Sequence, residues 1–167
     1  MGSVRTQHAE VTTHMPLRTR IFATYLDRFG RDSIVGMDLD DIRRSRAKVT
    51  KAVPPFTWIT GPVFADVTRE DTRFPARDGH EVPLRVYRPA GSREPLPVVV
   101  YFHGGGWVLG NTRMYDPLCS FLARAVEAIV VSVDYRMAPE HRAPKAVHDC
   151  VDSVRWIGEH ANSLGGN

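Results

Sequence analysis

The chain has 167 residues and holds 22 Lys and Arg against 19 Asp and Glu, a net charge of +3 at pH 7. This length is enough for one domain with a sizeable hydrophobic core. No apolar run approaches the roughly 18 residues that a membrane-spanning helix needs. The polar residues 1–16 also lack the apolar segment of a signal peptide. We therefore expect a globular protein without a membrane span, located in the cytoplasm.

The positive charge is concentrated near the N-terminus. Residues 1–53 hold 10 Lys and Arg against 6 Asp and Glu, whereas residues 54–167 hold 12 against 13. Such an excess could attract nucleic acid, but no aromatic residues interleave with it and no base-reading motif accompanies it. We predict a solvated helical face and no nucleic-acid partner.

Two amphipathic helices are predicted before residue 54. The first, over residues 17–29, has one apolar stripe and a stop at Gly30. The second begins at Asp38, whose carboxylate can cap it, and ends at Pro54-Pro55. Neither helix can bury its stripe alone, so both must pack against later residues. The two stripes comprise Ile21, Phe22, Tyr25, Leu26 and Phe29 in the first helix, and Leu39, Ile42, Val49 and Val53 in the second.

A linker over residues 54–62 is predicted to lead into a β-hairpin. Its first strand spans residues 63–74, with Ala65, Val67 and Phe74 facing inward, and its second strand spans residues 82–87. Asp78-Gly79 between them is a strong turn signal.

Buried parallel strands and helices alternate in the rest of the chain. Residues 97–102 and 128–133 are short β-branched runs, typical of buried strands of a parallel sheet. A helix over 115–126 separates them, and another begins at Pro144 and ends at Gly165-Gly166. The pattern predicts an α/β fold. The expected inward stripes are Leu118, Phe121, Leu122 and Ala125 in the first helix, and Val147, Cys150, Val151, Val154 and Ile157 in the second.

The two cysteines, Cys119 and Cys150, each lie on the apolar face of a predicted helix. Two lone cysteines without motif spacing are more often buried thiols than a bridge. We expect both thiols to be free.

Three consecutive glycines follow the strand at 97–102, in the stretch His103-Gly104-Gly105-Gly106-Trp107. Glycines let the backbone turn and approach a ligand closely, and two amide donors aimed at one point can stabilise an oxyanion. A His-Gly-Gly-Gly loop of this kind is known in α/β-hydrolases. A flexible glycine turn beside a buried histidine is the alternative.

Other functions for this loop fit less well. A dinucleotide-binding pattern would need glycine where Leu109 stands, and the chain has no P-loop. His103 has no histidine or cysteine at metal-ligand spacing. We expect neither a metal nor a cofactor.

Two stretches together resemble the hormone-sensitive-lipase-like α/β-hydrolases, which are bacterial-type carboxylesterases and lipases. They are residues 103–107 and Asp134-Tyr135-Arg136-Met137-Ala138-Pro139-Glu140-His141. The resemblance covers at least residues 54–167, with Met137 and Ala143 as small departures from the usual residues. It implies the N-terminal part of an α/β-hydrolase fold, with a mixed, mostly parallel sheet and flanking helices. Residues 1–53 would form a two-helix cap, and residues 54–167 the N-terminal half of the hydrolase domain.

The resemblance also implies roles for single residues. The amides of Gly105 and Gly106 would be oxyanion donors in the hydrolysis of a small-molecule ester, while His103 and Gly104 would support the loop. Trp107 would flank the substrate pocket, with plain core packing as the alternative. Arg136 and Glu140 are expected to stabilise their own loop by pairing. Asp134 is not expected to be the triad acid, because that acid follows the nucleophile in the family.

The nucleophile motif Gly-x-Ser-x-Gly is missing from these 167 residues. The nearest match, around Ser163, ends a helix and follows no strand, so we expect no nucleophile, acid or base in this chain. The chain would then be a first half truncated before the nucleophile turn, and inactive alone. It would self-associate through the exposed strand 97–102 or need a complementing C-terminal half. A non-catalytic ligand-binding protein and a degenerate remnant on the same scaffold remain alternatives.

Overall fold

The computed structural model describes residues 16–17, 19–21, 24, 36–49, 57–93 and 95–167. The chain forms two compact units, Met1–Met37 and Asp38–Asn167. In the first unit Leu17, residues 19–21 and Thr24 are helical, in agreement with the first predicted helix. Most of that helix's predicted stripe, and Gly30, lie outside the described residues.

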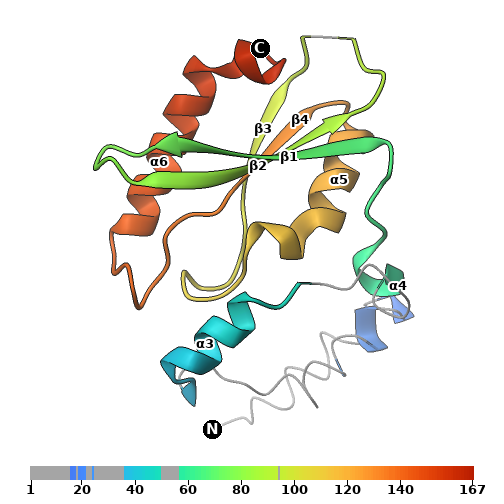
Figure 1. Cartoon of the computed structure of the whole chain (residues 1–167). Coiled ribbons are helices and arrows are strands. Elements are labelled where there is room, and N and C mark those ends of the chain that lie inside the picture. Colours follow the sequence, from blue (N-terminus) through green and yellow to red (C-terminus); the bar gives the residue numbers. More distant parts are fainter. Residues whose placement is uncertain (1–15, 18, 22–23, 25–35, 50–56, 94) are drawn as a thin grey trace, which may run out of the picture. The chain divides into compact units, whose positions relative to one another are not determined.

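A four-stranded mixed sheet is the centre of the second unit (Figure 1). Its strands are β1 (Val67–Pro75), β2 (Glu81–Pro89), β3 (Val98–Phe102) and β4 (Ile129–Val133), in the spatial order β1-β2-β4-β3. The β1–β2 and β2–β4 pairs are antiparallel, and β3 and β4 run parallel. Helices flank this sheet, so the predicted fold class is confirmed.

The predicted hairpin is present, with Gly79 in a left-handed conformation (φ 77°) in its turn. Val67 and Phe74 of β1 are buried as predicted. Ala65 is exposed and precedes the strand, so its predicted inward position is wrong. The chain turns at this point, since the Val67 amide donates to the Phe64 carbonyl (3.3 Å), and β1 begins only after the turn.

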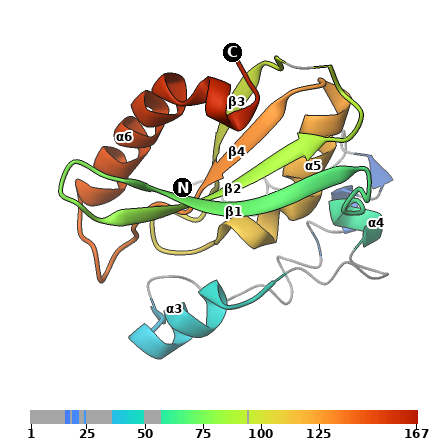
Figure 2. The ribbon, with the colours of Figure 1, turned by 45° about the horizontal axis from the view of Figure 1, so that its top comes forward.

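Helices α5 (Asp116–Ala125) and α6 (Lys145–Glu159) cover opposite faces of the sheet (Figure 2). Strand β4 contributes to both cores, because successive side chains of a strand point to opposite faces. Ile129, Val131 and Val133 belong to the core beneath α6, and Val130 to the core beneath α5. The two cysteines are free as predicted, and they lie on these separate helices.

The predicted inward stripes of both helices are largely wrong. The buried residues are Pro117, Cys119, Ser120 and Ala123 in α5, and Ala146, Asp149, Ser153 and Ile157 in α6. Most of the predicted apolar side chains are exposed instead: Leu118 and Phe121 in α5, and Val147, Val151 and Val154 in α6. The buried polar side chains of these helices have hydrogen-bond partners nearby or in other segments. The Ser153 hydroxyl, for example, donates to the Cys150 carbonyl (2.8 Å). Hydrophobic periodicity alone could not identify a face built this way.

Helix α3 (Leu39–Arg46) begins as predicted, because Asp38 caps it and accepts from the Asp41 amide (2.7 Å). It ends well before Pro54, with Ala47 as its C-cap residue. Ile42 is buried, whereas Leu39 and Val49 are exposed, and Val53 lies outside the described residues. The short α4 (Thr57–Thr60) falls within the predicted linker.

The chain ends beside β3. Helix α6 stops at Glu159, earlier than predicted, and the 3₁₀ helix η3 (Ala161–Leu164) follows. Gly166 then forms an isolated parallel bridge with Leu96, directly before β3. Among the described residues, no helix has the length and apolar character needed to cross a membrane.

Candidate active site

Two loops leave the same edge of the sheet, because β3 and β4 are parallel and both end there. We call residues 103–110, after β3, the glycine loop. Residues 134–144, which connect β4 to α6, are the β4–α6 loop. In open α/β sheets, ligands bind at the carboxyl ends of the strands, so these loops form the candidate site.

The glycine loop needs glycine at its sharpest turn. Gly105 has φ 137°, Gly106 has φ 62° and Gly110 has φ 93°. A Cβ on Gly105 would overlap the backbone carbonyl of Leu109. The Gly105 carbonyl accepts hydrogen bonds from the amides of Val108 (3.2 Å) and Leu109 (2.9 Å). The loop therefore closes on itself within five residues.

The side chain of His103 lies under this loop and is almost fully buried. Its ring stacks on Tyr135, with 4.5 Å between ring centroids. Nδ1 lies 3.0 Å from the Gly104 carbonyl oxygen, and because a carbonyl only accepts, Nδ1 is the donor. The Tyr135 hydroxyl donates to the His103 carbonyl (2.6 Å).

Asp134 lies close to the other ring nitrogen of His103. Its Oδ1 is 3.8 Å from Nε2, which has no hydrogen-bond partner among the described residues. Burial raises the pKa of the Asp134 carboxyl, and the nearby His103 opposes that shift. The predicted absence of a triad-acid role for Asp134 stays a prediction.

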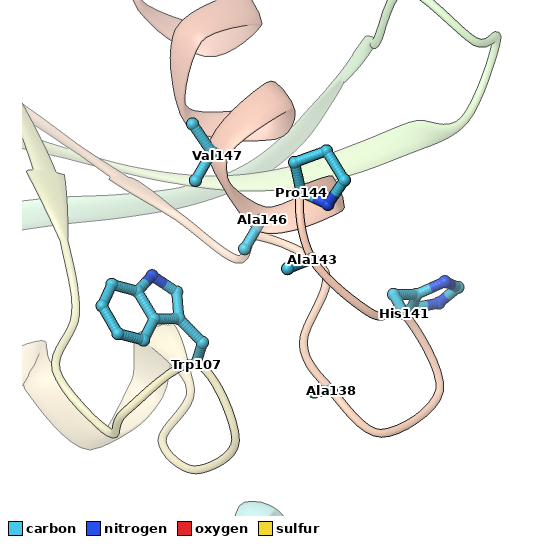
Figure 3. Close-up of a pocket in the computed structure, with 7 residues that line it drawn as sticks. All are labelled: Trp107, Ala138, His141, Ala143, Pro144, Ala146 and Val147. Carbon is cyan, nitrogen blue, oxygen red and sulfur yellow. The ribbon is translucent and has the colours of Figure 1, made fainter.

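Two cavities meet at Trp107. The first, of about 200 Å³, is lined by Phe102, His103, Gly104, Gly105, Gly106, Trp107, Tyr135 and Cys150. The second, of about 300 Å³, is apolar and lies between Trp107 and the start of α6; Figure 3 shows the indole across from Ala146 and Val147. Trp107 is 63% exposed and has a left-handed backbone (φ 59°).

Gly105 and Gly106 line the first cavity, which we call the glycine pocket. Within the part of the chain that the structure describes, neither amide donates to another group. Two neighbouring free donors in a small pocket can bind an oxygen that carries negative charge. The pocket also contains the thiol of Cys150, but burial raises its pKa to about 11, so it is no thiolate at neutral pH.

Ion pairs fix the β4–α6 loop to other segments of the chain. The Arg136 guanidinium binds the fully buried Asp149 of α6 (Nη2–Oδ1 2.6 Å) and Asp78 of the hairpin turn (2.9 Å). Arg136 and then Lys145 hold the pKa of the Asp78 carboxyl far below its usual range. Glu140 pairs with Arg46 of α3 (2.9 Å). The expectation that Arg136 and Glu140 stabilise their loop by pairing holds, but their partners belong to distant segments.

Two residues of the site were missed by sequence reasoning. Asp149 stands on a helix face of small and apolar residues, a signal that a buried partner had to exist. Arg46 gave no such signal, because it is one of several arginines in an apparently solvated helix.

Among the described residues, no three His, Cys, Asp or Glu side chains gather as metal ligands would. Ser163 lies in η3, where its hydroxyl donates to the His160 carbonyl (2.7 Å).

Comparison with known proteins finds esterases. A model of the α/β hydrolase fold matches residues 99–167. The carboxylesterase NlhH of Mycobacterium tuberculosis is 42% identical over 129 residues, which are 77% of this chain and 39% of that protein. The ethyl acetate hydrolase of Pseudomonas putida is 41% identical over 97 residues, 57% of this chain and 30% of that protein.

Solved structures give the same result. The hyperthermophilic esterase from Pyrobaculum calidifontis superposes with a TM-score of 0.67 and 37% identity, over 91% of this chain and 45% of that one. The chain thus spans less than half the length of the relatives it matches.

Proposed function

We propose that this chain, whose residues 99–167 belong to the α/β-hydrolase fold family, supplies the oxyanion-binding part of a carboxylic ester hydrolase. The observation that carries the proposal is the pair of free amides, Gly105 and Gly106, at the carboxyl end of β3. In this proposal residues 54–167 are the N-terminal half of the hydrolase domain, and residues 1–53 form a cap segment.

The proposed mechanism is that of a serine hydrolase. When a serine attacks the ester carbonyl, its oxygen becomes an anion, and the amides of Gly105 and Gly106 stabilise it. His103 and Gly104 hold the loop in shape. No Gly-x-Ser-x-Gly motif occurs in the 167 residues, so the nucleophile and its acid–base partners are assigned to residues outside them.

The apolar cavity beside Trp107 supports a proposal for the substrate class. About 300 Å³ between Trp107 and α6 suits a small apolar group, and Trp107 is assigned as its wall. A relative is described as an ethyl acetate hydrolase. We infer small-molecule esters with short acyl chains as substrates, and a cytoplasmic location.

Substitution of Gly105 tests the proposal in the intact protein. Gly105→Ala forces the loop to move, because the new Cβ overlaps the Leu109 carbonyl. We expect kcat for a p-nitrophenyl acetate substrate to fall about 10²- to 10³-fold, as when an oxyanion donor is lost. Gly79→Ala is the matched control, since Gly79 has a positive φ (77°) with open space around its Cα.

Two results would contradict the proposal. One is an unsubstituted intact protein that hydrolyses no ester; the other is an equal loss of activity in the Gly105 and Gly79 variants.

The 167-residue chain alone gives a separate test. Without a nucleophile, an oxyanion site can only polarise a carbonyl, so we expect no covalent labelling by a fluorophosphonate probe. Labelling of any serine in this chain would overturn the assignment of the nucleophile to residues outside it.

We also propose that the chain by itself associates through the open edge of β3. None of the five β3 residues is fully buried, and Val99 and Phe102 are each 38% exposed. Apolar strand edges of this kind pair with other chains. A second copy of the chain and a complementing C-terminal half are the two proposed partners.

A further inference from the structure

Helix α3 is fastened to both loops of the candidate site by one side chain, that of Arg46. Its Nε donates to the Val108 carbonyl in the glycine loop (2.8 Å). Nη2 donates to the Ala138 carbonyl in the β4–α6 loop, and Nη1 binds Glu140 of the same loop (2.9 Å). One guanidinium thus holds acceptors from two different loops, Val108 in one and Ala138 in the other, which are 30 residues apart in sequence.

A residue next to the glycine loop also binds the C-terminal end of α3. The Asn111 side chain, directly after the glycine loop, donates to the carbonyls of Arg46 (2.5 Å) and Lys48 (3.1 Å) at the end of α3. These carbonyls belong to the helix end, where intrahelical donors are missing. In Figures 1 and 2 this end of α3 lies beside the glycine loop, in agreement with these bonds.

Arg46 differs from the neighbouring arginines of α3. Its side chain is 19% exposed, whereas those of Arg43 and Arg44 are 61% and 68% exposed. Arg44 pairs with Asp41 one turn away on the helix surface, and such exposed pairs contribute little. Arg46 instead donates to two backbone carbonyls. Loss of this donor would leave the carbonyls unpaired, at the cost of their desolvation.

The guanidinium sits where the two loops touch. The Ala138 amide donates to the Trp107 carbonyl (2.9 Å), so the residue next to Gly106 is hydrogen-bonded to the β4–α6 loop. Arg46 binds on either side of this link, at Val108 and at the carbonyl of Ala138 itself. Because the fork of a guanidinium is planar and rigid, it sets the spacing between its acceptors.

We propose that Arg46 is a positioning residue, which fixes the glycine loop against the β4–α6 loop and so keeps the amides of Gly105 and Gly106 in place. This inference rests on the proposed ester hydrolysis for its effect on rate. The part that concerns the loop conformation does not depend on that function. Arg46 itself touches no reacting atom in this proposal.

The kinetic test compares Arg46→Met with Arg44→Met in the intact protein. Each variant removes one positive charge from α3, but only Arg46→Met removes hydrogen bonds to the two loops. Misplacement of a catalytic group by about 1 Å can lower the rate about 10²-fold. We expect Arg46→Met to lower kcat about 10- to 100-fold with little change in KM, and Arg44→Met to change neither.

Two further variants separate geometry from charge and from misfolding. Arg46→Lys keeps the charge but cannot reach both carbonyls, so we expect its kcat to lie closer to that of Arg46→Met than to the unsubstituted value. In Arg46→Ala, guanidinium ion added well below denaturing concentrations should occupy the vacated site and restore part of kcat. A protein that had merely lost stability would gain nothing from added guanidinium.

Amide hydrogen exchange gives a measurement independent of any ester. We expect peptides that cover residues 103–111 and 134–141 to exchange faster in Arg46→Met, while those that cover β4 are unchanged. The inference is overturned if Arg46→Met and Arg44→Met agree in kcat and in exchange, or if Arg46→Lys behaves like the unsubstituted protein. If the unsubstituted protein hydrolyses no ester, the proposed function fails, and exchange alone decides the role of Arg46.

Discussion

Strands β3 and β4 run side by side in parallel and each begin with three β-branched residues, yet they differ in burial. The sequences are Val-Val-Val-Tyr-Phe in β3 and Ile-Val-Val-Ser-Val in β4. All five residues of β4 are buried, and no residue of β3 is fully buried. β4 lies between β2 and β3 and contributes to the cores under both helices, whereas β3 pairs with a strand on one side among the described residues. Among the described residues, position in the sheet rather than local composition accounts for the difference in burial.

The two strands accordingly have different tasks. The glycine loop begins at the end of β3, so the exposed strand leads into the candidate chemistry. β4 stabilises the fold and leads into the loop that Arg136 ties to α6. Changes around β4 should therefore act on stability, and changes at the β3 edge on association.

The largest effect is expected where α6 is held over β4. Asp149→Ala removes the fully buried carboxylate that pairs with Arg136. Loss of one partner of a buried ion pair is strongly destabilising, and Arg136 would keep only Asp78 as its partner, so we expect a loss of about 3 kcal/mol in unfolding free energy. The matched control on the same helix is Asp152→Ala, whose partner Arg77 is half-exposed, with an expected loss of about 1 kcal/mol or less. Equal losses in urea denaturation would contradict this account.

A matched pair of valines tests the two strands directly. Val99 of β3 and Val130 of β4 are cross-strand partners, 38% and 0% exposed respectively. Truncation of the buried side chain loses its burial and leaves a cavity, so Val130→Ala should lower the unfolding free energy by about 2 kcal/mol. Val99→Ala should lower it by less than about 1 kcal/mol. If the two variants unfold at the same urea concentration, the difference in burial has no energetic meaning.

A charge at the strand edge should change association more than stability. We expect the 167-residue chain to self-associate and Val99→Lys to shift it toward monomer in sedimentation velocity, because lysines at edges prevent strand pairing. Val154→Lys, on the exposed apolar side of α6, is the control. If only the control variant becomes monomeric, the helix face and not β3 carries the association.

The smallest effect concerns the pH dependence of the loop anchor. Arg136 and Lys145 lower the pKa of the Asp78 carboxyl below its ordinary value of 3.8. The ionised form is therefore favoured in the folded state, and its stabilisation is present above pH 3.8 and lost as the pH falls through the lower folded pKa. We expect Asp78→Asn to be less stable than the unsubstituted chain near neutral pH, with the difference shrinking in acid. A difference that is constant with pH would show that the Asp78 charge is not involved.

Features encoded by adjacent residues were predictable from the sequence. The turn at Asp78-Gly79, the cap at Asp38 and the order of strand, glycine loop and helix all depend on neighbours within a few positions. The buried face of α6 was not, because Asp149 is buried only by virtue of Arg136, which another segment supplies. The partners of Glu140 were equally hidden, since Arg46 lies 94 residues away. In the candidate site, the glycine loop and His103 beside it were predictable, whereas Asp149 and Arg46, which other segments supply, were not.

The left-handed backbone of Trp107, with φ 59°, lowers the stability of the folded chain. Glycine adopts this conformation without penalty, whereas a large side chain held there stores about 1–3 kcal/mol of strain. The rest of the fold must supply that energy to keep an indole, largely exposed, between the two cavities. A variant selected for heat resistance alone would have reason to give up this tryptophan, whereas the proposed role of Trp107 as a wall of the substrate pocket would be a reason to keep it.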